Sequence, residues 1–361
     1  MVSHKLAGDL TTGTKTRIDY MIKAAVVILN WNGRKFLEQF IPKVVAYNPA
    51  YSEIIIADNC STDDSVEWMT NHFPQIKIIK NASNGGFAKG YNEALSQLDA
   101  EYFVLLNSDV EVTDNWMDPI ITLMDNDLTI AACQPKIRSF NEREKFEYAG
   151  AAGGFIDKWG FTFCRGRIFN TYENDLGQYD DTREVFWATG ACLFVRASAW
   201  KEIGGFDEDF FAHMEEIDLC WRLRNKEWKV MYCGSSTIYH IGGGTLTTKN
   251  PQKTFLNFRN NLILLCKNHA PGYFWLKIGL RMVLDSIASI RFLLTGEFTH
   301  SWAVFRAHMS FYKQLTKTLR KRREMKKEIK KYATSCIYKK SLIIAYYFNN
   351  KKKFSQLDQE I

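Results

Sequence analysis

The sequence predicts an α/β fold in which helices cover a mostly parallel, Rossmann-like sheet and a helical extension follows. Apolar runs alternate with segments of helical periodicity between residues 24 and 107, and such alternation is typical of parallel sheets. After about residue 246 the chain reads as helical. With 361 residues and 46% hydrophobic side chains, the chain is long enough for one large domain with an appendage, or for two domains.

Four short apolar runs predict the strands of that sheet. Turn residues end these runs, and segments with the spacing of an amphipathic helix separate them. A chain that crosses over a helix between two strands returns in the same direction, so we expect the strands to be parallel. The predicted strands are 24–30, 53–59, 76–80 and 102–107.

Polar residues follow these strands at their carboxyl ends. In open α/β sheets, ligands bind in the crevice beyond those ends. The sequence therefore predicts one binding site at this edge of the sheet. Its candidate residues are Asn30, Trp31, Asp58, Asn84, Gly85 and Asp109.

Asp109 stands at the mouth of an apolar strand, where burial of a carboxylate is costly unless something pairs with it. The residues alone leave two interpretations open. One is a loop carboxylate that caps a helix. The other, favoured by Glu111 two residues later, is a site for Mg²⁺ or Mn²⁺, which one or two carboxylates commonly hold together with substrate phosphates.

The glycine-rich stretch NASNGGFAKGYN at 81–92 matches neither G-x-x-x-x-G-K-[ST] nor G-x-G-x-x-G. It therefore argues against a P-loop NTPase and against a dinucleotide-dependent dehydrogenase. Gly85, Gly86 and Gly90 fit a turn before a helix, and they fit close approach of the backbone to a ligand equally well.

An acidic cluster opens a helix predicted in the second half of the chain. Glu215, Asp218 and Arg222 share one helical face, and Glu216 lies about a quarter turn away at the helix start. The helix dipole also favours an acidic first turn, so a solvated surface is the alternative. His240, at a predicted strand end before a glycine loop, is either a packed or capping histidine or a ligand.

Cysteine usage and charge indicate a compartment and a partner. The eight cysteines are scattered without a C-x-x-C pair, which fits reduced thiols in the cytosol better than disulfides or a zinc site. Residues 301–361 carry sixteen Lys and Arg against four Asp and Glu, a net charge of +12 that leaves −5 for the first 300 residues. This basic segment predicts an anionic membrane surface as partner, in preference to nucleic acid.

The helical region points to the same partner. The apolar stretch at 273–294 is interrupted by charged residues, so it predicts a helix lying in the membrane interface rather than one that spans the bilayer. Nine basic residues follow between 317 and 331. We therefore expect the region 246–331 to hold the protein electrostatically at the inner face of the cell membrane, with a solvated basic helix as the alternative.

Seven motifs occur together in one order: VVILNWNG, IIIADNCSTDDS, NGGFAKGYN, LLNSDVEV, TGACLFVRASAWKEIGGFDEDFFAHMEEIDLCWRLR, HIGGGT and RNNLILLCKN. With this order and spacing, the chain resembles the family 2 glycosyltransferases, specifically their bacterial rhamnosyltransferase-like branch, over about residues 24–270. The resemblance implies a GT-A fold, a nucleotide-sugar donor, Mn²⁺ or Mg²⁺ as a divalent metal, and inversion at the anomeric carbon.

The resemblance also implies roles for individual residues. Asn107, Ser108 and Asp109 occupy the family's D-x-D position, so Asp109 is the expected principal ligand of the metal, and His240 matches a second ligand. The expected donor-binding residues are Asn30 and Trp31 at the nucleobase, Asp58 at the base or ribose, and, elsewhere on the donor, Asn84, Gly85, Ser108, Gly190 and Arg222.

Glu215 and Glu216 match the family's Glu-Asp pair, whose second member is the usual base, so Glu216 is the expected catalytic base and Glu215 its nearest competitor. The expected enzyme is a hexosyl- or deoxyhexosyltransferase acting on a lipid-linked or cell-surface polysaccharide acceptor. The alternatives are a metal-dependent nucleotidyltransferase and a catalytically inactive, membrane-docked glycan-binding scaffold.

The expected organisation has four parts. Residues 1–21 form a loose N-terminal extension with either Met1 or Met21 as the start, and the catalytic domain spans 22–245. A basic helical extension at 246–335 and a basic tail at 336–361 complete the chain.

Overall fold

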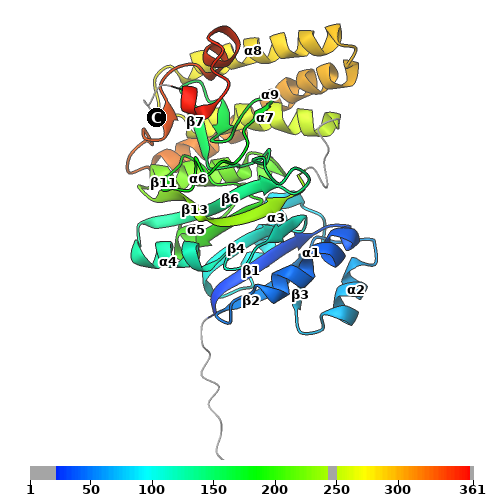
Figure 1. Ribbon diagram of the computed structural model, residues 1–361. Helices are drawn as coiled ribbons and strands as arrows, with labels where there is room; N and C mark the ends of the chain where they lie inside the picture. The colour runs from blue at the N-terminus through cyan, green and yellow to red at the C-terminus, as the bar shows by residue number, and fades with distance from the viewer. Residues whose placement is uncertain (1–21, 243–249, 358–361) are drawn as a thin grey trace, which may run out of the picture.

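The structure is a computed structural model that describes residues 22–242 and 250–357. Its centre is a nine-stranded sheet (Figure 1). The four predicted strands lie side by side in this sheet and run parallel, which confirms the open α/β prediction. They are β1 (Ile22–Asn30), β2 (Ser52–Asp58), β3 (Lys77–Lys80) and β4 (Ala100–Asn107). The expectations for residues 1–21 lie outside the described residues.

The second half of the sheet is mixed. Strand β12 (Cys192–Arg196) pairs antiparallel with β4, and β6 (Ile130–Ser139) pairs with β12. Beyond β6 lies β13 (Lys229–His240), which is parallel to it. The short strands β5 (Val110–Val112) and β11 (Thr182–Glu184) both pair with β13. This order brings the start of β12 and the end of β13 to the edge at which β4 ends.

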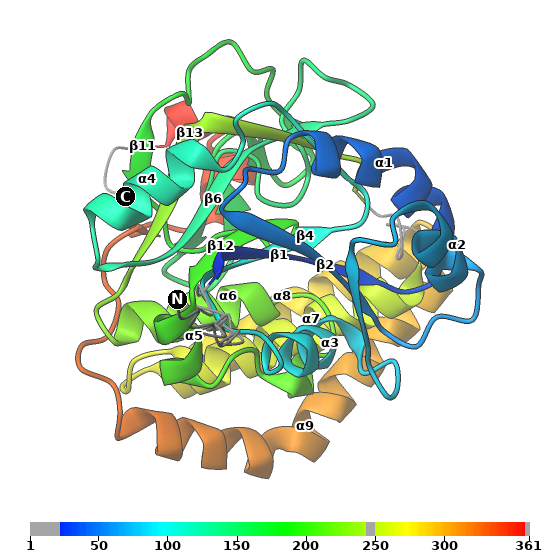
Figure 2. The same cartoon turned by 90° about the horizontal axis from the view of Figure 1, so that it is seen from below.

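Helices cover both faces of the sheet, as the alternation of side chains along the strands requires. Val26 and Ile28 of β1 belong to the core under α1 (Arg34–Ala46), α2 (Ser65–His72) and α4 (Asp118–Asn126). Ala25 and Val27 point to the opposite core, which packs under α3 (Gly86–Leu95), α5 (Ala197–Ile203) and α6 (Glu215–Asn225). Figure 2 shows the strands between these two layers.

A second, five-stranded sheet binds the C-terminal segment to the rest of the chain. Strand β14 (Ile337–Tyr338) pairs parallel with β7 (Gly154–Asp157), so the start of the expected basic tail is part of this sheet. The other strands are β8 (Thr162–Cys164), β9 (Arg167–Ile168) and β10 (Thr171–Tyr172). The short helices are η1 (Glu208–Phe210), η2 (Ile344–Phe348) and η3 (Phe354–Gln356).

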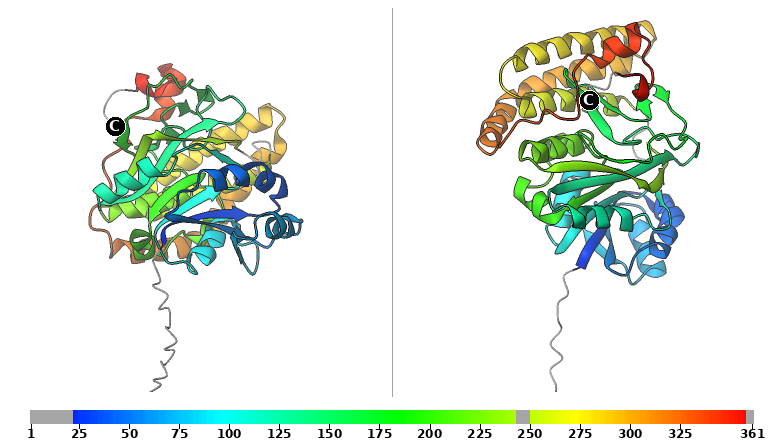
Figure 3. Two further views of the ribbon diagram at one scale, coloured as in Figure 1. Left: turned by 60° about the horizontal axis from the view of Figure 1, so that its bottom comes forward. Right: turned by 60° about the vertical axis from the view of Figure 1, so that its left-hand side comes forward.

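Three long helices follow β13, as the sequence predicts, and form a layer beyond α6 (Figure 3, right). They are α7 (Pro251–Asn268), α8 (Phe274–Leu294) and α9 (Phe298–Lys326). Leu262 and Leu265 of α7 are buried in the same core as α3 and α6, so the extension packs directly on the sheet domain. None of the helices in the described ranges is long and apolar enough to span a membrane.

Candidate active site

The end of β13 lies beside the end of β4 because β5 pairs with the last residues of β13. His240 stands opposite Val110 in this pairing. The pairing brings His240 Nε2 to 3.1 Å from Asp109 Oδ1, although 131 positions separate the two residues. The other ring nitrogen, Nδ1, lies 3.3 Å from Oε1 of Glu147, which is buried in the loop after β6. The structure thus places a histidine between two carboxylates at the strand edge.

The two carboxylates determine the charge of His240. Burial alone would lower the pKa of this imidazole, but Asp109 and Glu147 raise it to about 10. Asp109 and Glu147 therefore favour the protonated, positively charged form of His240 at the mouth of β4.

Glu111 takes no part in this cluster. Its carboxylate is buried against Lys43 and Arg143, each at 2.9 Å. Its charge is thus already paired, and the interpretation that joined Glu111 to Asp109 in one metal site is wrong.

Asn30 and Asp58 end β1 and β2 as paired residues in the parallel register. Asn30 Nδ2 donates to Asp58 Oδ1 at 3.1 Å and to the hydroxyl oxygens of Ser61 and Ser65 at 3.1 and 2.9 Å. The amide therefore fixes the Asp58 carboxylate at the sheet edge. Trp31, the next residue, is 45% exposed, so its ring can be reached by a ligand.

The glycine turn predicted before α3 is confirmed. Asn84 Oδ1 accepts hydrogen bonds from Gly86 N and Asn59 Nδ2, both at 3.0 Å, and Gly85 is the residue before the helix. Gly86 has φ +79°, and a Cβ atom there would lie 2.5 Å from the carbonyl oxygen of Phe211. Glycine is therefore required because the loop before α6 approaches the start of α3.

Contacts between β4, β12 and α6 place Glu216 near the same edge. Asn107 N donates to Ala191 O at 3.0 Å, so β12 begins beside the end of β4. The preceding residue, Gly190, faces α6, since a Cβ atom at this position would lie 3.9 Å from Glu216 Cβ. The structure thus brings Gly190 and Glu216 together, next to the loop that carries Asp109.

Glu215 and Glu216 differ in exposure and in pKa. Glu215 is buried, and burial together with repulsion from Glu216 raises its pKa well above the usual range. Glu216 is partly buried, and desolvation raises its pKa to about 7 although backbone N–H groups at the helix start lower it. Within the described residues, Oε2 of neither carboxylate has a hydrogen-bond partner. A carboxylate with a pKa near neutrality is suited to general base catalysis.

The loop that leads into α6 has a strained backbone that α7 holds in place. Positive φ angles, which side chains other than glycine rarely adopt, occur at Phe211 (64°), His213 (68°) and Met214 (74°). Asn260 of α7 binds this loop through its Nδ2, which donates at 2.9, 2.9 and 2.7 Å to the carbonyl oxygens of Phe210, Ala212 and His213. The position of Glu216 thus depends on a helix of the C-terminal extension.

Arg222 lies apart from the strand edge, and the donor-binding role expected for it does not fit its contacts. Its Nε donates to Asp218 at 2.7 Å, and its terminal nitrogens donate to the carbonyl oxygens of Ile203 and Gly205 at 2.8 and 2.7 Å. The guanidinium is nearly buried in these contacts. It therefore stabilises the turn after α5, a role that sequence spacing cannot distinguish from ligand binding.

Residues 25–204 match the family model described as glycosyl transferase family 2. The chain belongs to glycosyltransferase family 2. Among curated relatives, this glycosyltransferase is 24% identical over 284 residues to the N-acetylglucosaminyl-diphospho-decaprenol L-rhamnosyltransferase of Mycobacterium tuberculosis. That match covers 74% of this chain and 90% of the relative. The predicted family and enzyme class, including the likeness to rhamnosyltransferases, are confirmed.

Solved structures confirm the GT-A fold of the glycosyltransferase. GalNAc-T7 with UDP, GalNAc and Mn²⁺ aligns with a TM-score of 0.53 at 16% identity, over 71% of this chain and 50% of that one. This chain therefore spans about half the length of GalNAc-T7 in that structure. Residues 1–349 of TarS from S. aureus with UDP-GlcNAc align with a TM-score of 0.50 at 14% identity, over 85% and 84% of the two chains.

Asp109 and His240 of the glycosyltransferase fit a divalent cation whose coordination shell is completed by ligands from a substrate. Two donor atoms 3.1 Å apart, as in Asp109 and His240, match neighbouring positions of an octahedron whose radius is about 2.0–2.1 Å. Glu147 stands behind the imidazole, where metal-binding histidines usually have a carboxylate partner. In the part of the chain that the structure describes, no group of three or more His, Cys, Asp and Glu could hold a metal, so these residues alone supply an incomplete set of ligands.

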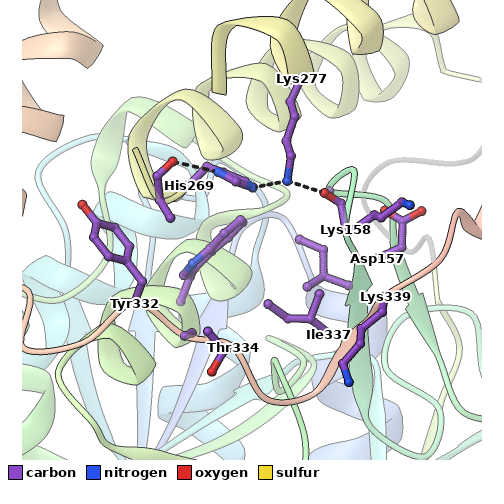
Figure 4. Close-up of a pocket in the computed structure, with 13 residues that line it drawn as sticks. Asp157, Lys158, His269, Lys277, Tyr332, Thr334, Ile337 and Lys339 are labelled. Carbon is purple, nitrogen blue, oxygen red and sulfur yellow. Dashed lines mark hydrogen bonds between the residues drawn. The ribbon is translucent and has the colours of Figure 1, made fainter. Parts of the chain in front are cut away.

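A cavity of about 330 Å³ opens elsewhere, between α6, α8 and the C-terminal segment (Figure 4). Trp221, His269 and Lys277 line it, and none of the candidate active-site residues does. Lys277 Nζ donates to Lys158 O at 2.7 Å and to His269 Nε2 at 2.6 Å, so the ammonium group is already hydrogen-bonded within the wall. We therefore assign this cavity no part in the glycosyltransferase site.

Two residues of the site were missed by sequence reasoning. Glu147 follows β6 without any motif around it, so no local signal could have identified it. Asn260 lies in RNNLILLCKN, where two adjacent amides interrupt an apolar helix. Buried amides in such a helix need hydrogen-bond partners, and that requirement was the available signal.

Proposed function

We propose that this enzyme transfers a hexosyl or deoxyhexosyl group from a nucleoside-diphosphate sugar to a hydroxyl of a lipid-linked or cell-surface polysaccharide acceptor, with inversion at the anomeric carbon. The relative from M. tuberculosis is named for an acceptor built on a decaprenol diphosphate, which supports a lipid-linked acceptor. The observation that carries the proposal is Glu216, a partly buried carboxylate with a raised pKa beside Gly190 and the end of β4.

In this proposal, the strand edge binds the donor. The exposed ring of Trp31 is positioned to stack on the nucleobase, and Asp58, fixed by Asn30, accepts a hydrogen bond from the base or ribose. Ser108 follows β4 beside Gly33 and faces the same edge, within reach of the diphosphate. Asp109 and His240 would hold Mn²⁺ or Mg²⁺, and the cation would take the place of the proton that the two carboxylates favour on His240. A bound cation supplies positive charge that stabilises the departing diphosphate.

Glu216 takes the proton of the acceptor hydroxyl while the new bond forms at the anomeric carbon. Its pKa of about 7 makes the ionised form available at neutral pH and leaves it basic enough to accept a proton. Glu215 is less available as a base because its deeper burial raises its pKa well above the usual range and favours the protonated carboxyl. The strained loop 211–214 fixes the direction from which Glu216 meets the acceptor.

The first experiment is to incubate the purified protein with a panel of nucleotide sugars and Mn²⁺ and to identify the released nucleotide. Release of nucleoside diphosphate supports sugar transfer, whereas release of pyrophosphate would show a nucleotidyltransferase. Asp109→Asn should lose metal-dependent donor binding without unfolding. Unchanged affinity of that variant for nucleoside diphosphate with Mn²⁺ would contradict the assignment of Asp109.

The second experiment compares Glu216→Gln with Glu215→Gln at saturating donor. We expect Glu216→Gln to lower kcat by at least about a hundredfold while donor binding is retained, since a general base contributes roughly 10²–10⁴-fold. The kcat of the wild-type enzyme should rise with pH up to about 7 and then level off. If Glu215→Gln loses activity while Glu216→Gln keeps it, the base is the neighbouring residue.

A cytoplasmic enzyme at the inner face of the cell membrane remains part of the proposal, because a lipid-linked acceptor lies in that membrane. The basic residues at 317–331 support an electrostatic contribution. Some of them already have partners in the fold: Lys321 pairs with Asp209 at 2.7 Å, and Arg322 donates to Cys266 O at 2.9 Å. Only part of this charge therefore faces outward.

A further inference from the structure

The face of α8 that packs against the protein carries a polar network beside the apolar contacts of Phe274, Ile278 and Met282. Its buried residues are Ile278, Arg281 and Asp285. Arg281 donates from Nε to Asp285 Oδ1 at 2.8 Å and from a terminal nitrogen to Asn261 Oδ1 of α7 at 2.6 Å. His308 Nε2 of α9 lies 3.5 Å from the other oxygen of Asp285. The charged residues that interrupt this apolar stretch therefore hold the helices together.

The opposite face of α8 is apolar and exposed. Its residues recur at intervals of four and three, which places them in one stripe along the helix. The stripe is 37–83% exposed and consists of Leu276, Leu280, Val283, Ile287, Ile290 and Leu294. A surface helix normally shows the reverse arrangement, with its apolar face turned to the core. We call this set the α8 stripe.

A second exposed stripe runs along α9, again at intervals of four and three. It is 39–66% exposed and consists of Phe298, Trp302, Phe305, Met309 and Tyr312. We call this set the α9 stripe. Tyr312 reaches Met282 of α8 at 3.4 Å, and Ser301, the neighbour of Trp302, contacts Ser289 of α8 at 2.7 Å. The α9 stripe therefore borders α8, and α8 and α9 pack beside each other as one helical hairpin (Figure 1).

The charge of the hairpin indicates which of two partners covers this surface, a second copy of the chain or an anionic lipid leaflet. Between residues 274 and 323 the chain has ten Lys and Arg but only two acidic residues, Asp285 and Glu297. Asp285 pairs with Arg281 inside the hairpin, and Lys317 and Lys321 pair with acidic residues of the loop before α6, so seven basic residues remain against Glu297. A second copy of the chain would bring the same positive charge against this face, whereas an anionic lipid leaflet would attract it. The exposed aromatic rings of Tyr273, Trp275 and Trp302 are typical of side chains at a membrane interface.

We propose that the α8 and α9 stripes insert into the headgroup and acyl boundary of an anionic lipid leaflet. The helices lie in the plane of the interface, and their polar network faces the protein. Burial of apolar side chains then supplies the binding, and the basic residues beside the stripes select anionic lipid. This inference names the surface for the membrane location proposed above, and it does not depend on which sugar is transferred.

The test is flotation of the full chain with vesicles of phosphatidylcholine, with and without phosphatidylglycerol. We expect the wild-type protein to bind the anionic vesicles and to remain partly bound in about 0.5 M salt, where electrostatic attraction alone is screened. Ile287→Asp, in the middle of the α8 stripe, should weaken binding at least about tenfold. Leu176→Asp is the matched control, because Leu176 is 85% exposed and lies outside the hairpin.

Three results would overturn the inference. The first is failure of the wild-type protein to bind either kind of vesicle, and the second is equal binding by Ile287→Asp and Leu176→Asp. The third is a wild-type dimer in sedimentation that Ile287→Asp dissociates, which would make a second copy the occupant. Nucleoside-diphosphate binding is measured in parallel for each variant. Loss of vesicle binding with intact nucleotide binding in Ile287→Asp supports the surface, and absence of nucleotide binding in the wild-type protein contradicts only the proposed function.

Discussion

The strand edge and the α8–α9 hairpin both bury charged side chains, but they treat them differently. In the hairpin, Arg281 and Asp285 face each other and further polar groups from α7 and α9. At the strand edge, Glu215 and Glu216 have raised pKa values, and one oxygen of each has no partner among the described residues. Removing one partner of a buried charge pair destabilises the fold. A buried charge that has no partner already costs stability, and it indicates a functional site.

The largest effect on stability should come from breaking the paired charges. Asp285→Ala leaves the Arg281 guanidinium buried without its carboxylate, so we expect the free energy of unfolding to fall by about 3–5 kcal/mol. Urea denaturation measures the change, and Ser286→Ala on the exposed side of α8 is the control. A loss below about 1 kcal/mol would mean that this pair behaves like a surface pair.

Removal of an unpaired charge should have the opposite sign. The pKa of Glu216 is raised from 4.5 to about 7, so its ionisation destabilises the folded state as pH rises from about 4.5 to 7, and the full cost is present above that range. Glu216→Gln stays neutral and should therefore be more stable than wild type above pH 7, by about 1–3 kcal/mol. The gain should vanish near pH 4. A variant that is less stable than wild type at pH 8 would contradict the raised pKa.

Asn260 connects the two regions, since it reaches from the helical extension to the loop before Glu216. Asn260→Ala removes three hydrogen bonds to that loop and should cost about 1–3 kcal/mol in unfolding free energy. We also expect kcat to fall while the KM for the donor stays unchanged, because the loop positions the base and not the donor. Gln252→Ala, at an exposed site in α7, is the control. Equal changes in kcat and KM would show a general loss of structure instead.

The smallest effect is expected at an exposed ion pair, which serves as the baseline for both regions. Lys23 and Asp125 are 2.7 Å apart and both about one-third exposed. Lys23→Ala should change the unfolding free energy by about 0–1 kcal/mol, and salt should reduce the difference. A larger and salt-insensitive loss would show that exposure is a poor guide to the cost of separating charges in this protein.

Local sequence determined the parallel strands, the polar residues at their ends and the glycine turn before α3. These features follow from side-chain periodicity and from the conformational freedom of glycine, which act over a few residues. The order of the motifs also indicated the family. Asp109 and His240 were both named from the sequence, and their roles as metal ligands stay predictions, although the structure brings their side chains together.

Only the tertiary structure decided which polar residues share a site. Pairing of β5 with β13 brings Asp109 to His240, and the loop after β6 brings Glu147 to the other ring nitrogen. Glu111 turns instead to Lys43 and Arg143. Helical spacing placed Arg222 with the acidic cluster, yet packing directs its guanidinium to the turn after α5. The polar network on the inner face of α8 likewise forms only because α7 and α9 supply partners for Arg281 and Asp285. Such contacts join residues far apart in the chain, and strand register and helix packing, which local periodicity does not encode, determine them.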